Sequence, residues 1–72
     1  MTGIDQVTLT VNGETRSFPP LGSIAELLDH LGLDTRMVVV EHNRRIVRRP
    51  ELAATAVSAG DVIELVHFVG GG

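Results

Sequence analysis

Three consecutive glycines, residues 70–72, are the part of the sequence whose type and spacing most directly suggest chemistry; they stand in the stretch HFVGGG of residues 67–72. Glycine has no side chain and accepts almost any backbone conformation, although ordering it costs more entropy than ordering any other residue. Three extended residues span at most about 10 Å, so such a segment can carry a carboxyl group through a narrow slot into a second protein. The same segment alone is also typical of a disordered end. The secondary structure predicted before it is needed to distinguish a functional segment from a disordered one.

The other residues with reactive side chains do not form a catalytic or metal-binding motif. His30, His42 and His67 fall on a predicted helix end, a turn and a strand, without the spacing of metal ligands. We therefore interpret them as surface histidines and predict no metal site, while the role of His67, the one nearest the glycines, stays open. Ser17 and Ser23 have no histidine and acidic partners in a motif. No P-loop lysine follows a glycine-rich stretch, so we expect no cofactor bound by the chain itself.

Four arginines lie within six residues, at Arg44, Arg45, Arg48 and Arg49. The simplest interpretation is a solvated hairpin surface. The alternative is a docking patch for an acidic partner surface, where the charges would mainly raise the rate of association. The sequence does not decide between the two.

Composition limits the class of protein. A chain of 72 residues forms one small core, and the absence of cysteine excludes disulfides and thiolate zinc sites, which fits a reducing cytoplasm. The net charge of −3 and the presence of only two aromatic residues argue against nucleic-acid binding. No apolar run approaches the roughly 20 residues that span a bilayer, and the first residues do not have the pattern of a secretory signal. We expect a cytoplasmic protein with no nucleic-acid or membrane partner.

The first half of the chain predicts a β-hairpin followed by a helix. Apolar and polar residues alternate over residues 7–11, and Asn12-Gly13 then favours a tight turn into a second strand that ends at Phe18, before two prolines. Ser23 is predicted as the helix N-cap, with Glu26 completing a capping box. The apolar residues that follow at helical spacing are Ile24, Leu27, Leu28 and Leu31, and Gly32 supplies the C-terminal stop.

The second half predicts three more strands. Residues 37–40 are a β-branched apolar run, HNRR turns the chain into a short strand at residues 46–47, and a proline-initiated short helix or 3₁₀ segment begins at Pro50. A turn at Gly60-Asp61 leads to the last strand, residues 62–69. The order β-β-α-β-β-β predicts an α+β fold with a mixed sheet of four to five strands covered by one main helix. We expect the β-grasp topology, with the first and last strands as parallel neighbours at the centre.

The last strand has two different faces. Ile63 and Leu65 belong to the face that a helix would cover, whereas Val66 and Phe68 share the other face with Glu64. Val66 and Phe68 are therefore predicted to be exposed immediately before the glycines.

With these elements in place, the sequence resembles the ubiquitin-like sulfur carriers, most closely the ThiS family of thiamine-biosynthesis sulfur carriers. The resemblance covers essentially the whole chain and rests on SIAELL, VVVEHNRRIVRRPE, AGDVIELV and FVGGG. It implies a β-grasp domain over residues 1–69 and a flexible tail at residues 70–72. Family members commonly have asparagine followed by glycine or another small or acidic residue in the turn at residues 43–44, and Arg44 departs from that pattern.

The resemblance implies that the carboxylate of Gly72 is the working group. An E1-like enzyme would adenylate it with ATP-Mg, and sulfur from a cysteine desulfurase or rhodanese-type donor would displace AMP, leaving a thiocarboxylate for thiazole synthase. Gly70 and Gly71 would thread into the active sites of these partners, and Val66 and Phe68 would contact the partners. The chain would be a protein cosubstrate and not an enzyme.

Several alternatives stay open at this point. The small subunit of molybdopterin synthase uses the same chemistry, but its family usually has a proline pair before a VSGG-like end, which VHFVGGG lacks. A carrier of sulfur for cysteine or another product is a second alternative. A ubiquitin-like modifier that forms amide bonds, or a plain interaction module with an idle tail, would belong to a different class.

Overall fold

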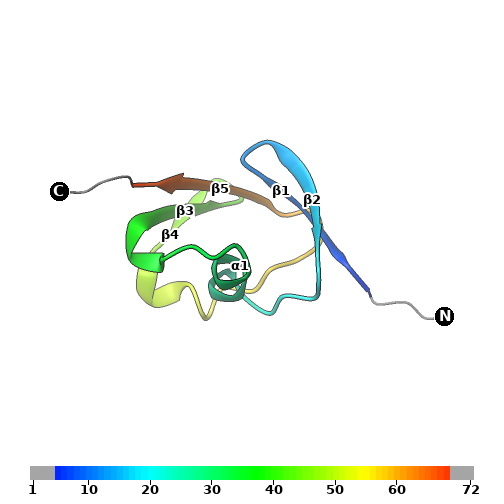
Figure 1. The fold of residues 1–72 in the computed structure, drawn as a ribbon, viewed down its shortest axis with the longest axis horizontal. Helices are drawn as coiled ribbons and strands as arrows, with labels where there is room; N and C mark the ends of the chain where they lie inside the picture. Colours follow the sequence, from blue (N-terminus) through cyan, green and yellow to red (C-terminus); the bar gives the residue numbers. More distant parts are fainter. Residues whose placement is uncertain (1–4, 69–72) are drawn as a thin grey trace.

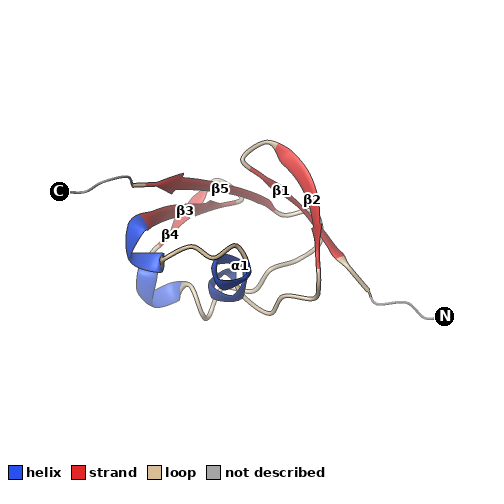
Figure 2. Ribbon diagram, in the orientation of Figure 1, coloured by secondary structure: helices blue, strands red, loops and turns tan. Residues whose placement is uncertain are grey.

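The computed structural model describes residues 5–68; residues 1–4 and 69–72 lie outside the description. Within it, five strands form one mixed sheet in the order β2-β1-β5-β3-β4, and one α-helix packs against one face of that sheet (Figure 1). Two 3₁₀ turns lie at the end of the sheet where β3 begins (Figure 2). The elements are β1 (Val7–Val11), β2 (Glu14–Phe18), α1 (Ile24–His30), η1 (Thr35–Met37), β3 (Val38–His42), β4 (Arg45–Val47), η2 (Arg49–Glu51) and β5 (Val62–His67).

The observed topology confirms the predicted α+β fold. Strands β1 and β5 are parallel neighbours, with Thr10 opposite Val62 and Val11 opposite Ile63. All other pairs in the sheet, β1 with β2, β3 with β5 and β3 with β4, are antiparallel. Strand β5 therefore occupies the centre of the sheet, with a neighbour on each side.

Both hairpins close through two-residue turns with positive φ angles. Asn12 and Gly13 have φ angles of 50° and 81°, and Asn43 and Arg44 have 50° and 72°. Consecutive left-handed residues form a type I′ turn, whose twist matches that of the strands on either side. The first turn confirms the Asn-Gly prediction, and the second places an arginine where glycine is the usual residue.

The start of α1 confirms half of the predicted capping box. Ser23 is the N-cap, and its Oγ accepts a hydrogen bond of 3.2 Å from the backbone N–H of Glu26. The Glu26 carboxylate, however, accepts from the N–H of Gly22 at 2.8 Å and not from that of Ser23. A Cβ atom at residue 22 would lie 2.9 Å from Glu26 Oε2, so glycine makes room for the carboxylate.

The end of α1 follows the predicted glycine stop. Gly32 has a φ angle of 73°. Its N–H donates to the carbonyl of Asp29, and the N–H of Leu33 donates to that of Leu28. This pair of hydrogen bonds is the Schellman motif, which satisfies carbonyl groups that have no partner inside the helix.

One hydrophobic core lies between the sheet and α1. The helix contributes Ile24, Leu27 and Leu28, each with 0 % of its surface exposed. The sheet and the loops contribute the rest, and Leu52, at the end of η2, adds its buried side chain to the core beside that turn. The buried core residues are Leu9, Val11, Phe18, Ile24, Leu27, Leu28, Val38, Val40, Leu52 and Ile63.

Several strand boundaries differ from the prediction: β3 continues to His42 and not only to Val40, and β4 begins at Arg45 and not at Ile46. Strand β3 begins at Val38 and not at Met37, because residues 35–37 form η1 under an Asp34 cap. Strand β5 ends at His67, and Val69 lies outside the described residues, as does the predicted boundary between domain and tail. No helix within residues 5–68 is long and apolar enough to cross a membrane.

Candidate functional site

The strand that leads to the glycines, β5, is held by hydrogen bonds on both sides. On one side it pairs with all five residues of β3, from Val38 opposite His67 to His42 opposite Ile63. On the other side, the N–H of Asn12 donates to the carbonyl of Ile63, and the Asn12 side chain accepts from the N–H of Leu65. Beyond the strand, the N–H of Phe68 donates to the carbonyl of Met37 at 2.8 Å. The chain is therefore fixed up to Phe68, two residues before Gly70.

The start of β5 is tied to the turn between β3 and β4. The N–H of Asn43 donates to the carbonyl of Val62, and the Asn43 side-chain oxygen accepts from the N–H of Val62, both at 2.8 Å. The Asn43 amide also donates to Asp61 Oδ1 at 3.1 Å. Because Asn43 makes these bonds from a left-handed turn position, it fixes the turn and the strand together.

His42 and Asp61 form a mostly buried pair at the same place. His42 Nε2 lies 2.7 Å from Asp61 Oδ2, and the two side chains are 19 % and 13 % exposed. Asp61 Oδ2 also accepts from the N–H of Ser58. Burial alone raises the pKa of Asp61, but the hydrogen bonds from His42, Ser58 and Asn43 outweigh burial and lower that pKa below its ordinary value.

The three histidines have different environments. The prediction that His42 is a surface residue holds only in part, because its side chain is 19 % exposed and bonds to Asp61. His30 and His67 are exposed, and the His30 ring meets the edge of Phe18 at a centroid distance of 5.6 Å. The residues of this network stand in two turns, His42-Asn43 and Gly60-Asp61. Only the contact between them, across 19 residues of sequence, distinguishes them from ordinary turns.

The face of the sheet opposite α1 carries apolar side chains. Val66 is 59 % exposed and Phe68 is 48 % exposed, so their predicted exposure is confirmed. Val39 lies directly opposite Val66 in the register of β3 and β5 and is also exposed. We call Val39, Val62, Val66 and Phe68 the outer-face patch. Contact of Val66 and Phe68 with a partner stays a prediction.

Two carboxylates adjoin the outer-face patch. Glu41 of β3 lies directly opposite Glu64 of β5. Residues opposite each other on one face are the closest side-chain neighbours in a sheet, and like charges there are destabilising. The fold itself gains nothing from this pair.

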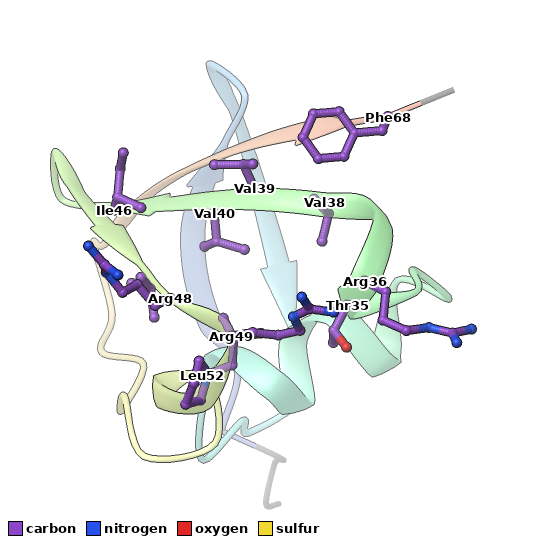
Figure 3. Close-up of a pocket in the computed structure, with 12 residues that line it drawn as sticks. Thr35, Arg36, Val38, Val39, Val40, Ile46, Arg48, Arg49, Leu52 and Phe68 are labelled. Atoms are coloured by element: carbon purple, nitrogen blue, oxygen red, sulfur yellow. The ribbon is translucent and has the colours of Figure 1, made fainter. Parts of the chain in front are cut away.

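A groove of about 820 Å³ opens at the end of the sheet near Phe68 (Figure 3). Its apolar lining comes from β3, β4 and Phe68, and its polar lining includes Arg36, Arg48 and Arg49. Arg45 lies instead in a smaller hollow beside His42 and Glu51. The structure thus divides the arginine run of the sequence between two surfaces.

Asp34 and Arg36 form an exposed ion pair at the edge of the groove. Two hydrogen bonds of 2.9 and 3.1 Å join the guanidinium group to the carboxylate, which also accepts from the Arg36 N–H. These bonds lower the pKa of Asp34 to about 2. Arg36 is therefore already neutralised, unlike the two arginines across the groove.

The predicted sulfur-accepting residue Gly72 and the predicted threading residues Gly70 and Gly71 lie outside the described residues. The structure describes the strand before them and the surfaces beside it. Within residues 5–68, no group of three or more His, Cys, Asp or Glu side chains is arranged to hold a metal ion.

A mixed sheet with parallel first and last strands at its centre, covered on one face by one helix, defines this region as a ubiquitin-like β-grasp domain. The ThiS family matches residues 9–72, and the chain belongs to this family. The match includes all three glycines of residues 70–72.

Solved structures agree with this assignment. The crystal structure of a thiamine biosynthesis protein, ThiS, from Geobacter metallireducens has a TM-score of 0.76 and 36 % identity, and the match covers 92 % of this chain and 100 % of that one. The solution structure of a thiamine biosynthesis protein from the same organism gives the same TM-score and identity over 88 % of its chain.

Curated relatives include both short and long proteins. The sulfur carrier protein ThiS of Bacillus subtilis is 41 % identical over 51 residues, which cover 71 % of this chain and 77 % of the relative. A thiazole synthase of Paramagnetospirillum magneticum is 45 % identical over 64 residues, or 89 % of this chain. The chain spans only 20 % of that thiazole synthase.

Proposed function

We propose that this chain is a sulfur carrier of thiamine biosynthesis, with the carboxyl group of Gly72 as the sulfur acceptor. The observation that carries the proposal is the match to the ThiS family, which extends through Gly72. The relative from Bacillus subtilis, whose name is sulfur carrier protein ThiS, supports the same role.

The chemistry needs an activating partner. A carboxylate does not react with a sulfur nucleophile until one of its oxygens becomes a good leaving group. In the proposed sequence an E1-like enzyme uses ATP-Mg to join the Gly72 carboxylate to AMP, with release of pyrophosphate. A persulfide sulfur from a cysteine desulfurase or a rhodanese-type donor then attacks the acyl carbon and displaces AMP. Reductive cleavage of the resulting acyl disulfide by a thiol leaves the thiocarboxylate.

In this proposal the chain acts as a protein cosubstrate in the cytoplasm. It presents the acyl group, and the partners supply catalysis. Gly70 and Gly71 thread into the partner active sites, since residues without side chains pass through a narrow slot and accept the backbone angles it imposes. The hydrogen bonds that hold β5 up to Phe68 support this role, because they fix the point from which the glycines extend.

Thiazole synthase is the proposed acceptor of the sulfur. Two relatives named thiazole synthase, from Paramagnetospirillum magneticum and Magnetococcus marinus, contain a stretch that is 45 % and 37 % identical to this chain. In both, that stretch is about a fifth of the protein, so a region like this chain is joined to a thiazole synthase in one polypeptide. Such fusion supports a functional association between the two.

Intact-protein mass spectrometry tests the proposal. The chain is incubated with an E1-like activating enzyme, ATP-Mg and a sulfur donor, and we expect the mass change of one oxygen-to-sulfur exchange on the peptide that ends in Gly72. A variant that lacks Gly72 serves as the matched control, and its folding is checked by circular dichroism. A folded Gly72 deletion that still acquires sulfur would contradict the assignment of the acceptor. A branched peptide joined through an amide bond would instead indicate a protein modifier.

A further inference from the structure

The groove beside β3 exists because β4 is shorter than its neighbour. Strand β4 pairs only with residues 40–42 of β3, from Val47 opposite Val40 to Arg45 opposite His42. Pro50 then lies in η2, and proline has no N–H to continue a ladder. The chain leaves the sheet after Val47, so the edge of β3 at Val38 and Val39 borders the groove and no neighbouring strand covers it on that side within residues 5–68.

The groove combines an apolar wall with positive charge. Val38 and Val40 line its base but are almost fully buried, with 9 % and 1 % of their surfaces exposed. The exposed apolar side chains are Val39, Ile46 and Phe68, and Ile46 and Phe68 stand at the two ends of the groove (Figure 3). Its volume of about 820 Å³ lies within the range of about 300 to 1,000 Å³ that is usual for binding sites.

Arg48 and Arg49 both lie on the side of the groove formed by β4 and η2 (Figure 3). Figure 3 shows Arg48 beside β4, below Ile46, while Arg49 extends from η2 toward Thr35. The ion pairs among residues 5–68 are Arg36 with Asp34 and His42 with Asp61, so neither the Arg48 nor the Arg49 guanidinium group has a carboxylate within 4 Å there. The Glu51 carboxylate instead accepts from the backbone N–H of Arg48 at 3.2 Å. The charge of Arg49 contributes to the lowered pKa of Asp34.

The distribution of charge is unusual for this chain. The chain has a net charge of −3, yet half of its six basic residues line one groove. A surface that served only for solubility would not need exposed apolar side chains beside two guanidinium groups that have no carboxylate partner among residues 5–68. Arginine also binds carboxylates through two parallel hydrogen bonds, which suits recognition as well as charge.

We propose that this groove is a docking site for an extended acidic segment of a partner protein, in which carboxylates flank an apolar residue. The apolar residue packs against the exposed side chains of Val39 and Phe68, and the carboxylates beside it pair with Arg48 and Arg49. The open edge of β3 offers backbone groups to an extended segment, as in other cases where a peptide extends a sheet. A segment bound here also touches Phe68 and thereby brings the partner close to the glycines.

A titration followed by nuclear magnetic resonance tests the inference without any sulfur chemistry, so its outcome is independent of the proposed function. The probe is the blocked hexapeptide Glu-Glu-Val-Leu-Glu-Glu, added to the isotopically labelled chain, and Gln-Gln-Val-Leu-Gln-Gln is the neutral control. We expect saturable shifts at the amides of Val38, Val39, Arg49 and Leu52. The acidic peptide should bind about fivefold more tightly than the neutral one, as two exposed ion pairs allow, and added salt should reduce the difference.

Matched double variants separate the groove from the general charge of the arginine run. R48Q/R49Q should weaken binding of the acidic peptide about fivefold, whereas R44Q/R45Q removes the same charge outside the groove and should change it by less than about twofold. All four arginines are exposed, and the spectrum of each variant reports whether it is folded. Equal losses in both variants, equal binding of both peptides, or shifts confined to other surfaces would overturn the inference. Groove shifts produced equally by inorganic phosphate would indicate a phosphate site, and shifts that depend only on protein concentration would indicate self-association; either result would also overturn it.

Discussion

At the scale of the residue, Arg44 has the least favourable backbone conformation among residues 5–68. Its φ angle of 72° is one that residues with a side chain adopt at a cost of about 1 to 2 kcal/mol. In the equivalent turn of the first hairpin, Gly13 has a φ angle of 81° with no such cost. The turn tolerates Arg44 because Asn43 is fixed by hydrogen bonds to Val62 and Asp61.

Replacing Arg44 with glycine should therefore stabilise the protein. The expected gain is about 0.5 to 1 kcal/mol, because removal of the strain exceeds the entropy that glycine adds to the unfolded chain. Urea unfolding measures it as a higher midpoint with an unchanged slope. The matched variant Arg45→Gly lies one residue later in β4, where glycine weakens a strand, and should be destabilised. A lower stability of Arg44→Gly than of the natural chain would contradict this account of the turn.

Asp61 should make stability depend on pH in the acid range. Because hydrogen bonds lower its pKa in the folded state, its contribution is complete above the unfolded pKa of about 3.9 and is lost as the pH falls through the lower folded value. Asp61→Asn should cost about 1 to 2 kcal/mol at pH 7, since charged hydrogen bonds to His42 and Ser58 are lost. Its free energy of unfolding should also fall less than that of the natural chain between pH 5 and pH 3. Parallel pH profiles for the two proteins, measured by urea unfolding, would refute the role of Asp61.

At the scale of the element, β5 combines a well-held strand with an unfavourable pair. Hydrogen bonds to β1, β3 and two turn asparagines hold it, yet Glu64 faces Glu41 across the outer face.

Glu64→Gln should increase stability by about 0.2 to 1 kcal/mol at low salt, because it removes the repulsion with Glu41. Salt screens exposed charges, so the gain should shrink as salt is added. Thermal unfolding at two salt concentrations measures both effects. Glu14→Gln is a useful control. Glu14 lies in the edge strand β2, opposite the apolar Val11, so its substitution should show no such gain. Equal effects of the two substitutions would assign the gain to net charge alone.

The elements themselves were largely predictable from the sequence. Local signals determine them: alternation in β1, the Asn12-Gly13 turn, the Ser23 cap and the Gly32 stop each act within a few residues. The outward orientation of Val66 and Phe68 followed from alternation as well.

The features that escaped prediction are contacts between distant residues. His42 and Asp61 are 19 residues apart, and the sequence contains no local signal that their turns meet. The groove depends on where β4 ends relative to β3, which is set by the register of the hairpin and by Pro50. Glu26 bonds to Gly22 in place of Ser23, a choice between neighbouring N–H groups that only the geometry of the loop decides.

At the scale of the whole molecule, the two faces of the sheet have separate tasks. The helix and loops cover one face and supply the core, whereas the opposite face carries the outer-face patch (Figure 1). Exposed apolar residues contribute little to the fold, so the outer-face patch is where the predicted contact with a partner would be made. The groove adds a second surface at the end of the sheet where β5 approaches the glycines.

The outer-face patch provides the matched comparison that tests its role in partner contact. Val62, Val66 and Phe68 are 42 %, 59 % and 48 % exposed on the same face, but Val62 lies at the start of β5, far along the strand from the glycines. If the proposed function is right, substituting Val66 or Phe68 with serine should lower the kcat/KM with which an E1-like enzyme adenylates the chain by about tenfold, because each substitution removes the proposed contact with that enzyme.

Val62→Ser removes a similar exposed apolar group and should change that value by less than about twofold, since a partner that holds the glycines contacts the end of β5 and not its start. Release of pyrophosphate measures the rate, and urea unfolding shows whether the three variants are equally stable. Equal losses in all three variants would mean that any apolar group on this face contributes, so that the strand as a whole and not its last residues meets the enzyme. If replacing Val66 and Phe68 left the kcat/KM of adenylation unchanged, the predicted contact of these residues would be wrong. Recognition by the enzyme would then depend on the glycines and the groove.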